Sequence, residues 1–367
     1  MTTTVRAAVC RAFGEPLAIE ELTLADPGPG ELRVDVAACA VCHSDISFVD
    51  GLWGGDLPAV WGHEAVGTVV DVGDGVDVAL GATVVVTLIR SCGQCHFCRR
   101  GQTVACTQTW PLDERSPLTD AAGAAVHHGL RTAAFAEQVV VHQSQCVVVP
   151  DDLSAASAAL LACGVITGVG AVTNTAQVEA GSTVVVIGCG GVGLNVVQGA
   201  ALADASVVVA VDLEASKLDL ARSLGATHGA NPATDDVAAV VAEATAGVMA
   251  DYVFVAVGAK AAFDSATALA SSMGAIVLVG MPASGVTTEI DPGTIAAMNQ
   301  RILGSKMGTS VIADDIPELV TAYRAGRLEL DRLVSSTVPL DRINEAMDEV
   351  RAGSALRNVV VFPPEGG

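Results

Sequence analysis

The chain has 367 residues, of which 51% are hydrophobic, and its formal net charge is −22. This length predicts about two domains, each large enough for its own core. So acidic a surface would repel phosphate backbones, which argues against a nucleic-acid partner, and the longest apolar stretch, 183–211, is too often interrupted by glycines and polar residues to predict a membrane span.

No charged-then-apolar leader opens the sequence, so we expect a cytoplasmic protein without a signal peptide. In that compartment, the ten cysteines are expected to be metal ligands or buried thiols and not disulfides.

The first 150 residues predict a mostly antiparallel β domain whose loops carry ligands. A proline and glycine cluster at 26–30 precedes an alternating stretch at 31–37, and apolar stretches follow at 67–73 and 82–86. Turn residues followed by alternation are typical of antiparallel strands.

Two short segments of this region combine metal-binding residue types. The first reads Cys42-His43-Ser44-Asp45 and the second Trp61-Gly62-His63-Glu64. A thiolate and an imidazole together suit zinc, and a catalytic zinc needs three protein ligands and one open position. We expect Cys163 to be the third ligand.

Four closely spaced cysteines predict a second, structural zinc site. Cys92, Cys95, Cys98 and Cys106 follow the pattern C-x2-C-x2-C-x7-C on a glycine-containing loop, which suits a closed tetrahedral site of four sulfurs. His96 lies inside the loop and is expected to face solvent.

The remaining cysteines and histidines are assigned no role. Cys10, Cys39 and Cys146 are expected to be small buried hydrophobes, and Cys189 a bystander in the glycine loop. Isolated histidines are usually surface or core residues, which is how we interpret His127, His128 and His142.

After Pro150 the pattern changes to alternating strands and helices, which predicts a parallel sheet. A helix is expected at 154–161, capped by Ser154 or Asp152. Strands are expected at 183–187, 207–211, 252–257 and 275–280, and helices at 192–203 and 216–223. From about residue 307 a helix (316–326) and a last strand (358–362) are expected to return to the first domain.

A dinucleotide-binding loop is predicted between the first of these strands and its helix. Residues 188–193 match G-x-G-x-x-G, and Asp212 ends the next strand nineteen positions after Gly193. Gly188 permits the tight turn, Gly190 lets the backbone approach the pyrophosphate, and Gly193 packs helix on strand. Asp212 would bind the ribose hydroxyls and repel a 2′-phosphate, which predicts NAD and not NADP.

Taken together, these segments resemble the zinc-containing medium-chain alcohol dehydrogenases over essentially the whole chain. The resemblance implies an α/β fold in which a Rossmann doubly wound parallel sheet, residues 165–306, is inserted after a mostly antiparallel β (GroES-like) catalytic domain. That catalytic domain would comprise residues 1–164 and be completed by 307–367.

The resemblance also implies a role for each matching residue. Cys42, His63 and Cys163 would hold the catalytic zinc. Glu64 would be the carboxylate behind the metal and belongs to the same metal site. Asp45 would orient His63, and Ser44 would take the substrate proton. The coenzyme NAD(H) would contact His43, Gly188, Gly190, Gly191, Val192, Gly193, Asp212, Lys217, Val279, Met281 and Arg357, with His43 and Arg357 at the pyrophosphate. The four-cysteine loop would hold a second zinc.

The implied activity is the interconversion of alcohols with aldehydes or ketones, in a homodimer or homotetramer. Two positions depart from the family pattern. Ser47 stands where many members have a histidine that ends the proton relay, and serine cannot act as a base near neutral pH. Trp53 stands where the glutathione-dependent formaldehyde dehydrogenases place an acid. With Leu88 in the expected pocket, Trp53 favours apolar alcohols over thiol adducts.

Three alternatives remain. They are a formaldehyde dehydrogenase acting on S-hydroxymethyl-glutathione, a zinc-free reductase of activated double bonds, and a non-catalytic nucleotide-binding relative. Retention of Ser44 and of all three zinc-ligand candidates argues against the last two.

Overall fold

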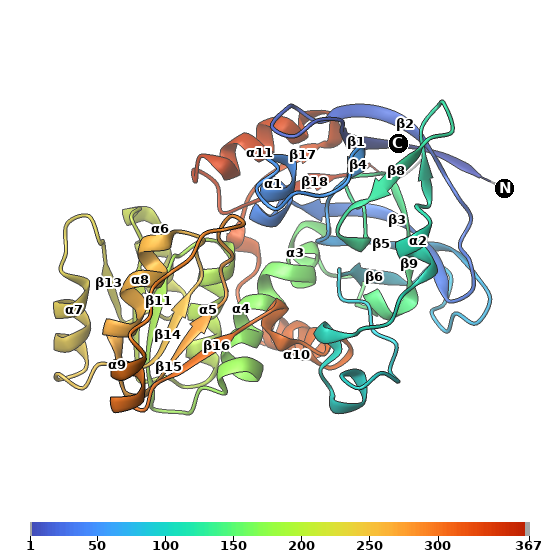
Figure 1. The fold of residues 1–367 in the computed structure, drawn as a ribbon. Coiled ribbons are helices and arrows are strands. Elements are labelled where there is room, and N and C mark those ends of the chain that lie inside the picture. Colours follow the sequence, from blue (N-terminus) through green and yellow to red (C-terminus); the bar gives the residue numbers. More distant parts are fainter. Residues whose placement is uncertain (1, 364–367) are drawn as a thin grey trace. The chain divides into compact units, whose positions relative to one another are not determined.

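The computed structural model describes residues 2–363, and the chain forms two compact units (Figure 1). Unit 1 comprises Met1–Cys163, Val311–Thr321 and Leu330–Gly367, and unit 2 comprises Gly164–Ser310 and Ala322–Glu329. Unit 2 thus begins at Gly164, and the chain returns to unit 1 at Val311. Residues 322–329 also belong to unit 2.

Unit 1 is built from a closed barrel and a sheet. The barrel has the order β1-β2-β7-β8-β4, and the sheet has the order β10-β6-β5-β3-β18-β17 with β9 also paired to β3. All pairs are antiparallel except β4 with β8 and β17 with β18, which confirms the mostly antiparallel prediction. The strands are β1 (Thr3–Cys10), β2 (Ala18–Leu24), β3 (Glu31–Ala40), β4 (Ala59–Val60), β5 (Ala65–Val72), β6 (Thr83–Val86), β7 (Leu118–Thr119), β8 (Ala125–His128), β9 (Gln138–His142), β10 (Cys146–Val148), β17 (Val334–Pro339) and β18 (Arg357–Val361).

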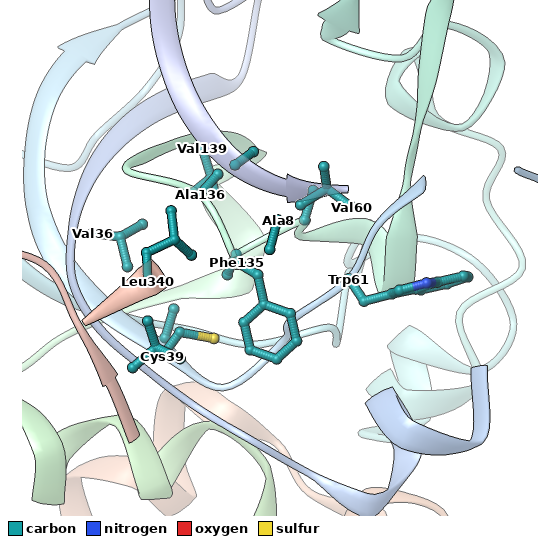
Figure 2. Packing of buried hydrophobic residues seen from close by; sticks show 14 of the residues in the cluster. Ala8, Val36, Cys39, Val60, Trp61, Phe135, Ala136, Val139 and Leu340 are labelled. Carbon is teal, nitrogen blue, oxygen red and sulfur yellow. The ribbon is translucent and has the colours of Figure 1, made fainter. Parts of the chain in front are cut away.

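The core of unit 1 surrounds Phe135, whose side chain is fully buried (Figure 2). Burying a ring of this size contributes roughly 1.5–3 kcal/mol. The backbone of Gly62, at φ +92°, lies so close that an added Cβ would stand 2.6 Å from the Phe135 nitrogen. Only glycine fits there, and the residue that follows it is His63. The core therefore fixes the loop that carries a predicted metal ligand.

The helices of unit 1 are short, and the last segment of the chain closes the sheet as predicted. Strand β18 pairs antiparallel with β3, so the end of the chain returns to the first domain. The Ser154 hydroxyl caps α3 by accepting a hydrogen bond from the Ser157 N–H. The helices are α1 (His43–Val49), α2 (Pro111–Glu114), α3 (Ala155–Leu160), α10 (Ile312–Arg324), whose last turn belongs to unit 2, and α11 (Ile343–Arg351).

Unit 2 is a six-stranded sheet of order β13-β12-β11-β14-β15-β16, and every pair in it is parallel. Its central strands are continuous runs of buried valines, as expected where both faces of a sheet are covered. The strands are β11 (Thr183–Ile187), β12 (Val207–Val211), β13 (His228–Ala230), β14 (Ala250–Val255), β15 (Ala270–Leu278) and β16 (Arg301–Gly304). The helices are α4 (Ile166–Gly170), α5 (Gly191–Leu202), α6 (Ala215–Ser223), α7 (Val237–Ala244), α8 (Lys260–Leu269) and α9 (Pro292–Ala297).

One helical stretch, Ala155–Ala176, is long and apolar enough to cross a membrane by length and composition. It joins α3 and α4 through two π-helical segments, Leu161–Val165 and Ala171–Ala176. In its most apolar window 89% of the residues are buried inside the protein, so protein contacts already account for its hydropathy. Cys163 lies within the first π-helical segment, where the changed helical pitch re-aims side chains.

Candidate active site

The segment from Cys42 to Glu64 is organised around the buried carboxylate of Asp45. Its Oδ1 accepts hydrogen bonds from the Gly62 N–H and from His63 Nδ1, both at 3.0 Å, and its Oδ2 accepts one from the Cys42 N–H, also at 3.0 Å. Cys42 is the N-cap of α1, and Asp45 is the third residue of that helix. One carboxylate thereby ties together two predicted metal ligands that are twenty-one positions apart in the sequence.

Four buried side chains converge beside this carboxylate, as predicted from sequence. One ligand atom from each of Cys42, His63, Glu64 and Cys163 lies within 4.8 Å of the others. All four residues belong to unit 1. The predicted third ligand, Cys163, is therefore brought to the other two by the fold.

The charges of this cluster suit a cation. The Cys163 thiol donates a hydrogen bond to Cys42 and, with the His63 ring, lowers the pKa of Cys42 well below its ordinary range, although burial opposes the shift. The same hydrogen bond, together with burial, raises the pKa of Cys163. Burial would lower the pKa of His63, but Asp45 and then Cys42 together outweigh it, and the pKa is raised. One of the two thiols is thus favoured as a thiolate, which is the form that binds a metal ion.

A zinc ion fits this donor set. With Nδ1 of His63 bound to Asp45, Nε2 is buried and has no hydrogen-bond partner in the described part of the chain. Such an orphaned nitrogen, aimed at two sulfurs, is costly unless it receives a ligand. Two cysteines and one histidine are a known catalytic zinc set, of which alcohol dehydrogenase itself is the standard example.

Behind the cluster, Glu64 forms a buried ion pair with Arg357, which contributes one guanidinium nitrogen to Glu64 Oε2. Burial raises the pKa of Glu64 to about 8, and Arg357 opposes that rise. A guanidinium stays protonated in proteins, so the pair stabilises the ionised carboxylate. Oε1 of Glu64 is buried and without a hydrogen-bond partner among the described residues. The coenzyme contact expected of Arg357 stays a prediction.

The four cysteines of the predicted structural site also converge. The sulfurs of Cys92, Cys95, Cys98 and Cys106 lie within 4.8 Å of one another. Backbone N–H groups point at them, at 3.3 Å from Cys95 to Cys92 Sγ and 3.4 Å from Cys98 to Cys95 Sγ. Hydrogen bonds from the backbone of Cys98 and Thr107 lower the pKa of Cys95 to about 5. Backbone hydrogen bonds also lower the pKa of Cys92, whereas burial raises that of Cys98 to about 12. A closed set of four sulfurs suits structural zinc. His96, inside the loop, is exposed as expected.

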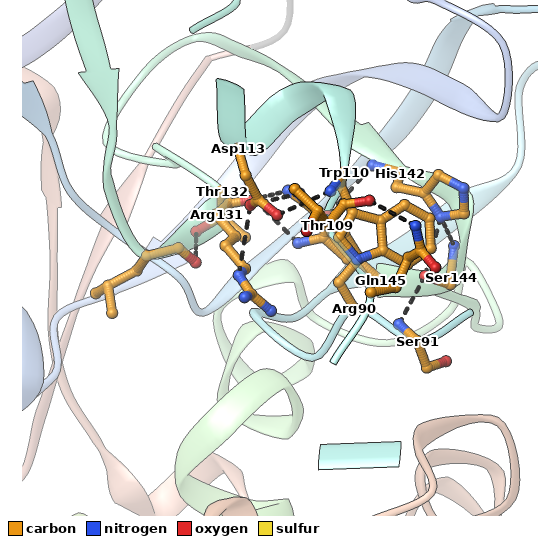
Figure 3. A network of polar contacts seen from close by, with 12 residues as sticks. Arg90, Ser91, Thr109, Trp110, Asp113, Arg131, Thr132, His142, Ser144 and Gln145 are labelled. Carbon is orange, nitrogen blue, oxygen red and sulfur yellow. Dashed lines mark hydrogen bonds and ion pairs between the residues drawn. The ribbon is translucent and has the colours of Figure 1, made fainter. Parts of the chain in front are cut away.

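A polar network that sequence reasoning missed anchors this cysteine loop (Figure 3). The Arg90 guanidinium is fully buried and donates to Gln145 Oε1 at 2.8 Å, to Asp113 Oδ1 at 3.0 Å and to the Arg131 carbonyl at 3.3 Å. It also lies over the Trp110 ring, 5.8 Å from the ring centre. The only sequence signal was a charged residue ending an apolar run just before Cys92.

The glycine loop of unit 2 has the geometry that dinucleotide binding requires. Gly188 adopts φ +93°, and an added Cβ at Gly193 would lie 1.7 Å from the Gly188 carbonyl oxygen, so both positions need glycine. Gly190 is the N-cap of α5, and an added Cβ there would meet nothing within 4 Å. That open space is next to the N–H groups that begin α5, where a phosphate would bind.

Asp212 joins the glycine loop to the end of β12. One carboxylate oxygen accepts a hydrogen bond from the Cys189 N–H at 2.7 Å, and the other accepts one from the Glu214 N–H at 3.0 Å. Each oxygen keeps a second lone pair for a ribose hydroxyl. The Cys189 side chain is buried, which agrees with its interpretation as a bystander.

The other predicted site residues lie in positions of differing exposure. Ser44 Oγ is 3.7 Å from Cys42 Sγ, so this hydroxyl lies beside the candidate metal centre. His43 and Met281 are exposed and Val279 is buried. The side chains of Trp53, Leu88 and Lys217 are half-buried. Roles at coenzyme or substrate stay predictions for these residues. Of the three cysteines expected to be buried, Cys10 and Cys39 are, whereas Cys146 is only partly covered.

Comparisons with known proteins agree with this geometry. Residues 28–151 match the family model for the alcohol dehydrogenase GroES-like domain, and residues 191–324 match that for zinc-binding dehydrogenases. An NDMA-dependent alcohol dehydrogenase of Amycolatopsis methanolica is 35% identical over 368 residues, which cover 97% of this chain and 98% of the relative. A probable S-(hydroxymethyl)glutathione dehydrogenase of Schizosaccharomyces pombe is 34% identical over 369 residues, covering 98% and 97%.

A solved structure shows the same likeness. The crystal structure of an alcohol dehydrogenase zinc-binding domain protein from Burkholderia ambifaria has a TM-score of 0.94 and 34% identity, over 99% of this chain and all of the other. Family models, relatives and fold thus agree with the two cysteine-containing clusters and the glycine loop. The chain belongs to the zinc-containing medium-chain alcohol dehydrogenase family.

Proposed function

We propose that this protein interconverts alcohols with aldehydes or ketones by hydride transfer to and from NAD(H), with zinc held by Cys42, His63 and Cys163. The observation that carries the proposal is the unpartnered, buried Nε2 of His63, which lies with two cysteine sulfurs in one cluster. Zinc in such a site supplies Lewis acidity, which eases deprotonation of an alcohol and reduction of a carbonyl.

The chain's own residues prepare that chemistry. Asp45 favours the His63 tautomer that leaves Nε2 as a ligand, because its Oδ1 accepts a hydrogen bond from the Nδ1–H group. In the oxidation direction, bound NAD+ would supply the acceptor for the hydride from the carbinol carbon, so the protein has only the hydroxyl proton to move. Ser44, 3.7 Å from Cys42, can accept the hydroxyl proton while donating its own onward.

The last acceptor of that proton is open, because Ser47 cannot serve as a base. We propose bulk water, with the exposed imidazole of His43 as a helper. The test is the pH dependence of kcat/KM in a His43→Gln variant. A profile identical to that of the unchanged protein would remove His43 from the relay.

We propose NAD(H) as the coenzyme. A carboxylate at Asp212 can accept hydrogen bonds from ribose hydroxyls and repels a 2′-phosphate.

We propose a second zinc in the four-cysteine site, so that a fully loaded chain holds two zinc ions. We also propose a cytoplasmic homodimer or homotetramer acting on small molecules, which size-exclusion chromatography with light scattering can test.

Apolar primary or secondary alcohols are the proposed substrates. The alternative is a thiol adduct, because one relative is named a probable S-(hydroxymethyl)glutathione dehydrogenase. Trp53 argues against it, since an indole offers no carboxylate to hold the adduct's charged groups. Strong turnover of S-hydroxymethyl-glutathione with poor turnover of simple alcohols would reverse this choice.

The decisive experiment pairs metal analysis with turnover. A panel of alcohols and aldehydes is assayed with NAD(H) and with NADP(H), followed at the nicotinamide absorbance. A parallel arm uses NDMA, because one relative is named for its dependence on that compound. We expect two zinc ions per chain and turnover with NAD(H). A non-catalytic relative would give no turnover in any arm.

A variant of the third ligand sharpens this test. In Cys163→Ala we expect one zinc per chain and a loss of activity of about a hundredfold or more, since a metal stabilises the transition state by several kcal/mol. Cys146→Ala is the matched control, because this partly buried thiol belongs to neither cluster. Equal zinc content and activity in both variants would disprove the catalytic site.

A further inference from the structure

A single buried hydroxyl holds the peptide group that leads into His63. Thr132 is fully buried, and its Oγ1 donates a hydrogen bond to the Gly62 carbonyl at 2.6 Å. The Ala134 N–H donates to the same carbonyl at 2.9 Å. That carbonyl belongs to the planar peptide bond between Gly62 and His63. The two donors therefore fix the direction in which the His63 side chain leaves the backbone, while Asp45 holds its ring.

The segment that carries Thr132 has a strained backbone. Leu130, Arg131 and Ala133 adopt φ angles of +50°, +63° and +51°, the left-handed region that residues other than glycine seldom occupy. Such conformations persist only where the surrounding structure holds them in place. Thr132, in the middle of this segment, therefore depends on contacts from outside the segment for its position.

Those contacts come from Arg90 and Gln145. The Arg131 carbonyl accepts hydrogen bonds from Arg90 Nη2 at 3.3 Å and from Gln145 Nε2 at 3.0 Å. This carbonyl belongs to the peptide bond that leads into Thr132, so the two side chains fix the Thr132 backbone. In Figure 3, Arg131 and Thr132 belong to the same polar network as Arg90. All of these residues lie in unit 1.

Arg90 also closes the base of the four-cysteine loop. It stands two positions before Cys92, and its partner Asp113 stands seven positions after Cys106, so this ion pair of 3.0 Å joins the two ends of the loop. A metal ion held by four sulfurs fixes the chain between those ends. Order in the loop therefore extends to Arg90, the residue that holds the Arg131 carbonyl.

The Thr132 hydroxyl can take two arrangements. It has one proton and two acceptors within reach, the Gly62 carbonyl at 2.6 Å and the Leu130 carbonyl at 3.3 Å. The backbone position that Arg90 holds favours the Gly62 acceptor. Without that hold the strained segment can relax, and the hydroxyl can turn to Leu130. The carbonyl before His63 would then keep a single donor.

We propose that Thr132 is a positioning residue for the candidate catalytic metal centre. Through Arg90 and Thr132, zinc in the four-cysteine loop raises the affinity of the catalytic centre for its own zinc. This inference rests on the proposed function, because it takes both clusters as zinc sites, and it concerns the regulation of the catalytic one. The coupling is reciprocal, since linked binding free energies change by the same amount at both sites.

Two substitutions of Thr132 test the positioning role. Thr132→Val keeps the shape of the side chain but removes the donor, whereas Thr132→Ser keeps the hydroxyl. Each protein is equilibrated with a chelator of known zinc affinity, and the zinc that stays bound is measured. A parallel Cys163→Ala series reports the four-cysteine site alone. We expect Thr132→Val to bind the catalytic zinc about tenfold more weakly, as for other groups that orient a metal ligand, and Thr132→Ser to retain the affinity.

The control is Thr245→Val, which removes a similar hydrogen bond in unit 2. Thr245 is buried, and its hydroxyl donates to the Val241 carbonyl at 2.7 Å. It belongs to neither metal cluster. Both valine variants should lower the free energy of unfolding, but only Thr132→Val should weaken zinc binding. Equal zinc affinity in the two valine variants overturns the positioning role, as does a Thr132→Ser protein that binds zinc as weakly as Thr132→Val.

A double-mutant cycle tests the link between the two sites. Cys106→Ser removes one sulfur of the loop and should weaken the catalytic zinc about fivefold, the lower end of typical coupling between sites. In the Thr132→Val background the same change should cause no further loss, because the connection is already broken. Effects that simply multiply overturn this route. Should Cys106→Ser not fold, Arg90→Met takes its place in the cycle.

The unchanged protein separates this inference from the proposed function. Catalytic zinc of equal affinity in every variant, together with turnover of alcohols, overturns the inference and leaves the proposed function standing. Absence of zinc from the centre of Cys42, His63 and Cys163 in the unchanged protein overturns both.

Discussion

The Nδ1 atom of His63 lies 3.0 Å from Oδ1 of Asp45, and both side chains are fully buried. The same carboxylate accepts two backbone N–H groups, from Cys42 and Gly62. Three donors therefore converge on one acceptor, and their common effect is to aim the free nitrogen of His63 at the sulfur pair.

Asp45→Asn should weaken metal binding at this centre and leave the four-cysteine site loaded. An asparagine has one acceptor oxygen and one amide donor, so at least one of the three donors would face an N–H group and the ring would lose its fixed orientation. Loss of such a carboxylate typically costs 10- to 100-fold in metal affinity. Under a competing chelator, we expect zinc content to fall from about two toward one per chain.

The control for this variant is Asp50→Asn. Asp50 caps the end of the same helix and pairs with Arg351 at 2.9 Å, away from the metal ligands. It should retain both metal ions under the same chelator. Equal zinc retention in the two variants would mean that Asp45 does not orient the ligand.

Alanine substitutions at two glycines of the nucleotide loop should act differently, one on coenzyme binding and the other on stability. Gly190→Ala adds a Cβ in open space, so the protein should fold normally but bind NAD(H) several-fold more weakly, because the methyl group would meet the approaching pyrophosphate. Gly193→Ala adds a Cβ 1.7 Å from a backbone oxygen and should lower the melting temperature. Unaltered NAD(H) affinity in Gly190→Ala would exclude a pyrophosphate at this position.

Much of the fold could be predicted from sequence where the pattern was unambiguous. Val-rich runs bounded by turns gave strands β11 and β12 with the bounds that the structure has, because a doubly covered sheet demands continuous apolar residues. Cysteine spacing predicted the four-cysteine cluster, whereas the other cluster was predicted from the residue types around Cys42 and His63, with Cys163 as the candidate third ligand. Helix α1 was not predicted: its residues lack an apolar period, and the Asp45 contacts hold it instead.

Contacts between distant residues could not be predicted. Arg90 and Gln145 are fifty-five positions apart, and nothing in either neighbourhood specifies the other as a partner. The Glu64–Arg357 pair spans 293 positions and became visible only when β18 lay beside β3. Side-chain partners of this kind depend on topology, which periodicity does not report.

His128 should make the protein sensitive to acid. It is buried beside Arg90, His127 and Arg115, and burial first, then Arg90, lowers its pKa to about 3. In the unfolded chain a histidine titrates near 6.5. Because the folded pKa is depressed, the stabilising contribution is complete above about pH 6.5 and is lost progressively as pH falls toward 3.

Replacement by a side chain that does not titrate should flatten this loss. At pH 5 the expected cost of a neutral buried histidine is about 2 kcal/mol relative to pH 7, so His128→Gln should lose less stability over that interval. His127→Gln, at an exposed neighbour, should retain the original pH dependence. The free energy of unfolding, measured in urea from pH 7 to pH 5, checks this; parallel curves for both variants would contradict it.

Arg90 should be the residue on which the four-cysteine loop depends most. Replacing it with methionine keeps the apolar stem but leaves Gln145 and Asp113 without their shared donor, and removing one member of a buried pair costs up to about 3–5 kcal/mol. Asp113 is 28% exposed, so we expect the lower part of that range. Because Arg90 lies two residues before Cys92, chelators should also remove the loop's zinc faster.

Arg131→Met is the control: this side chain is 43% exposed and 3.7 Å from the same carboxylate, so its loss should cost no more than about 1 kcal/mol. The free energy of unfolding measures the loss of stability, and a chromogenic chelator measures the rate of zinc removal. Equal values of both in the two variants would rule out Arg90 as the anchor.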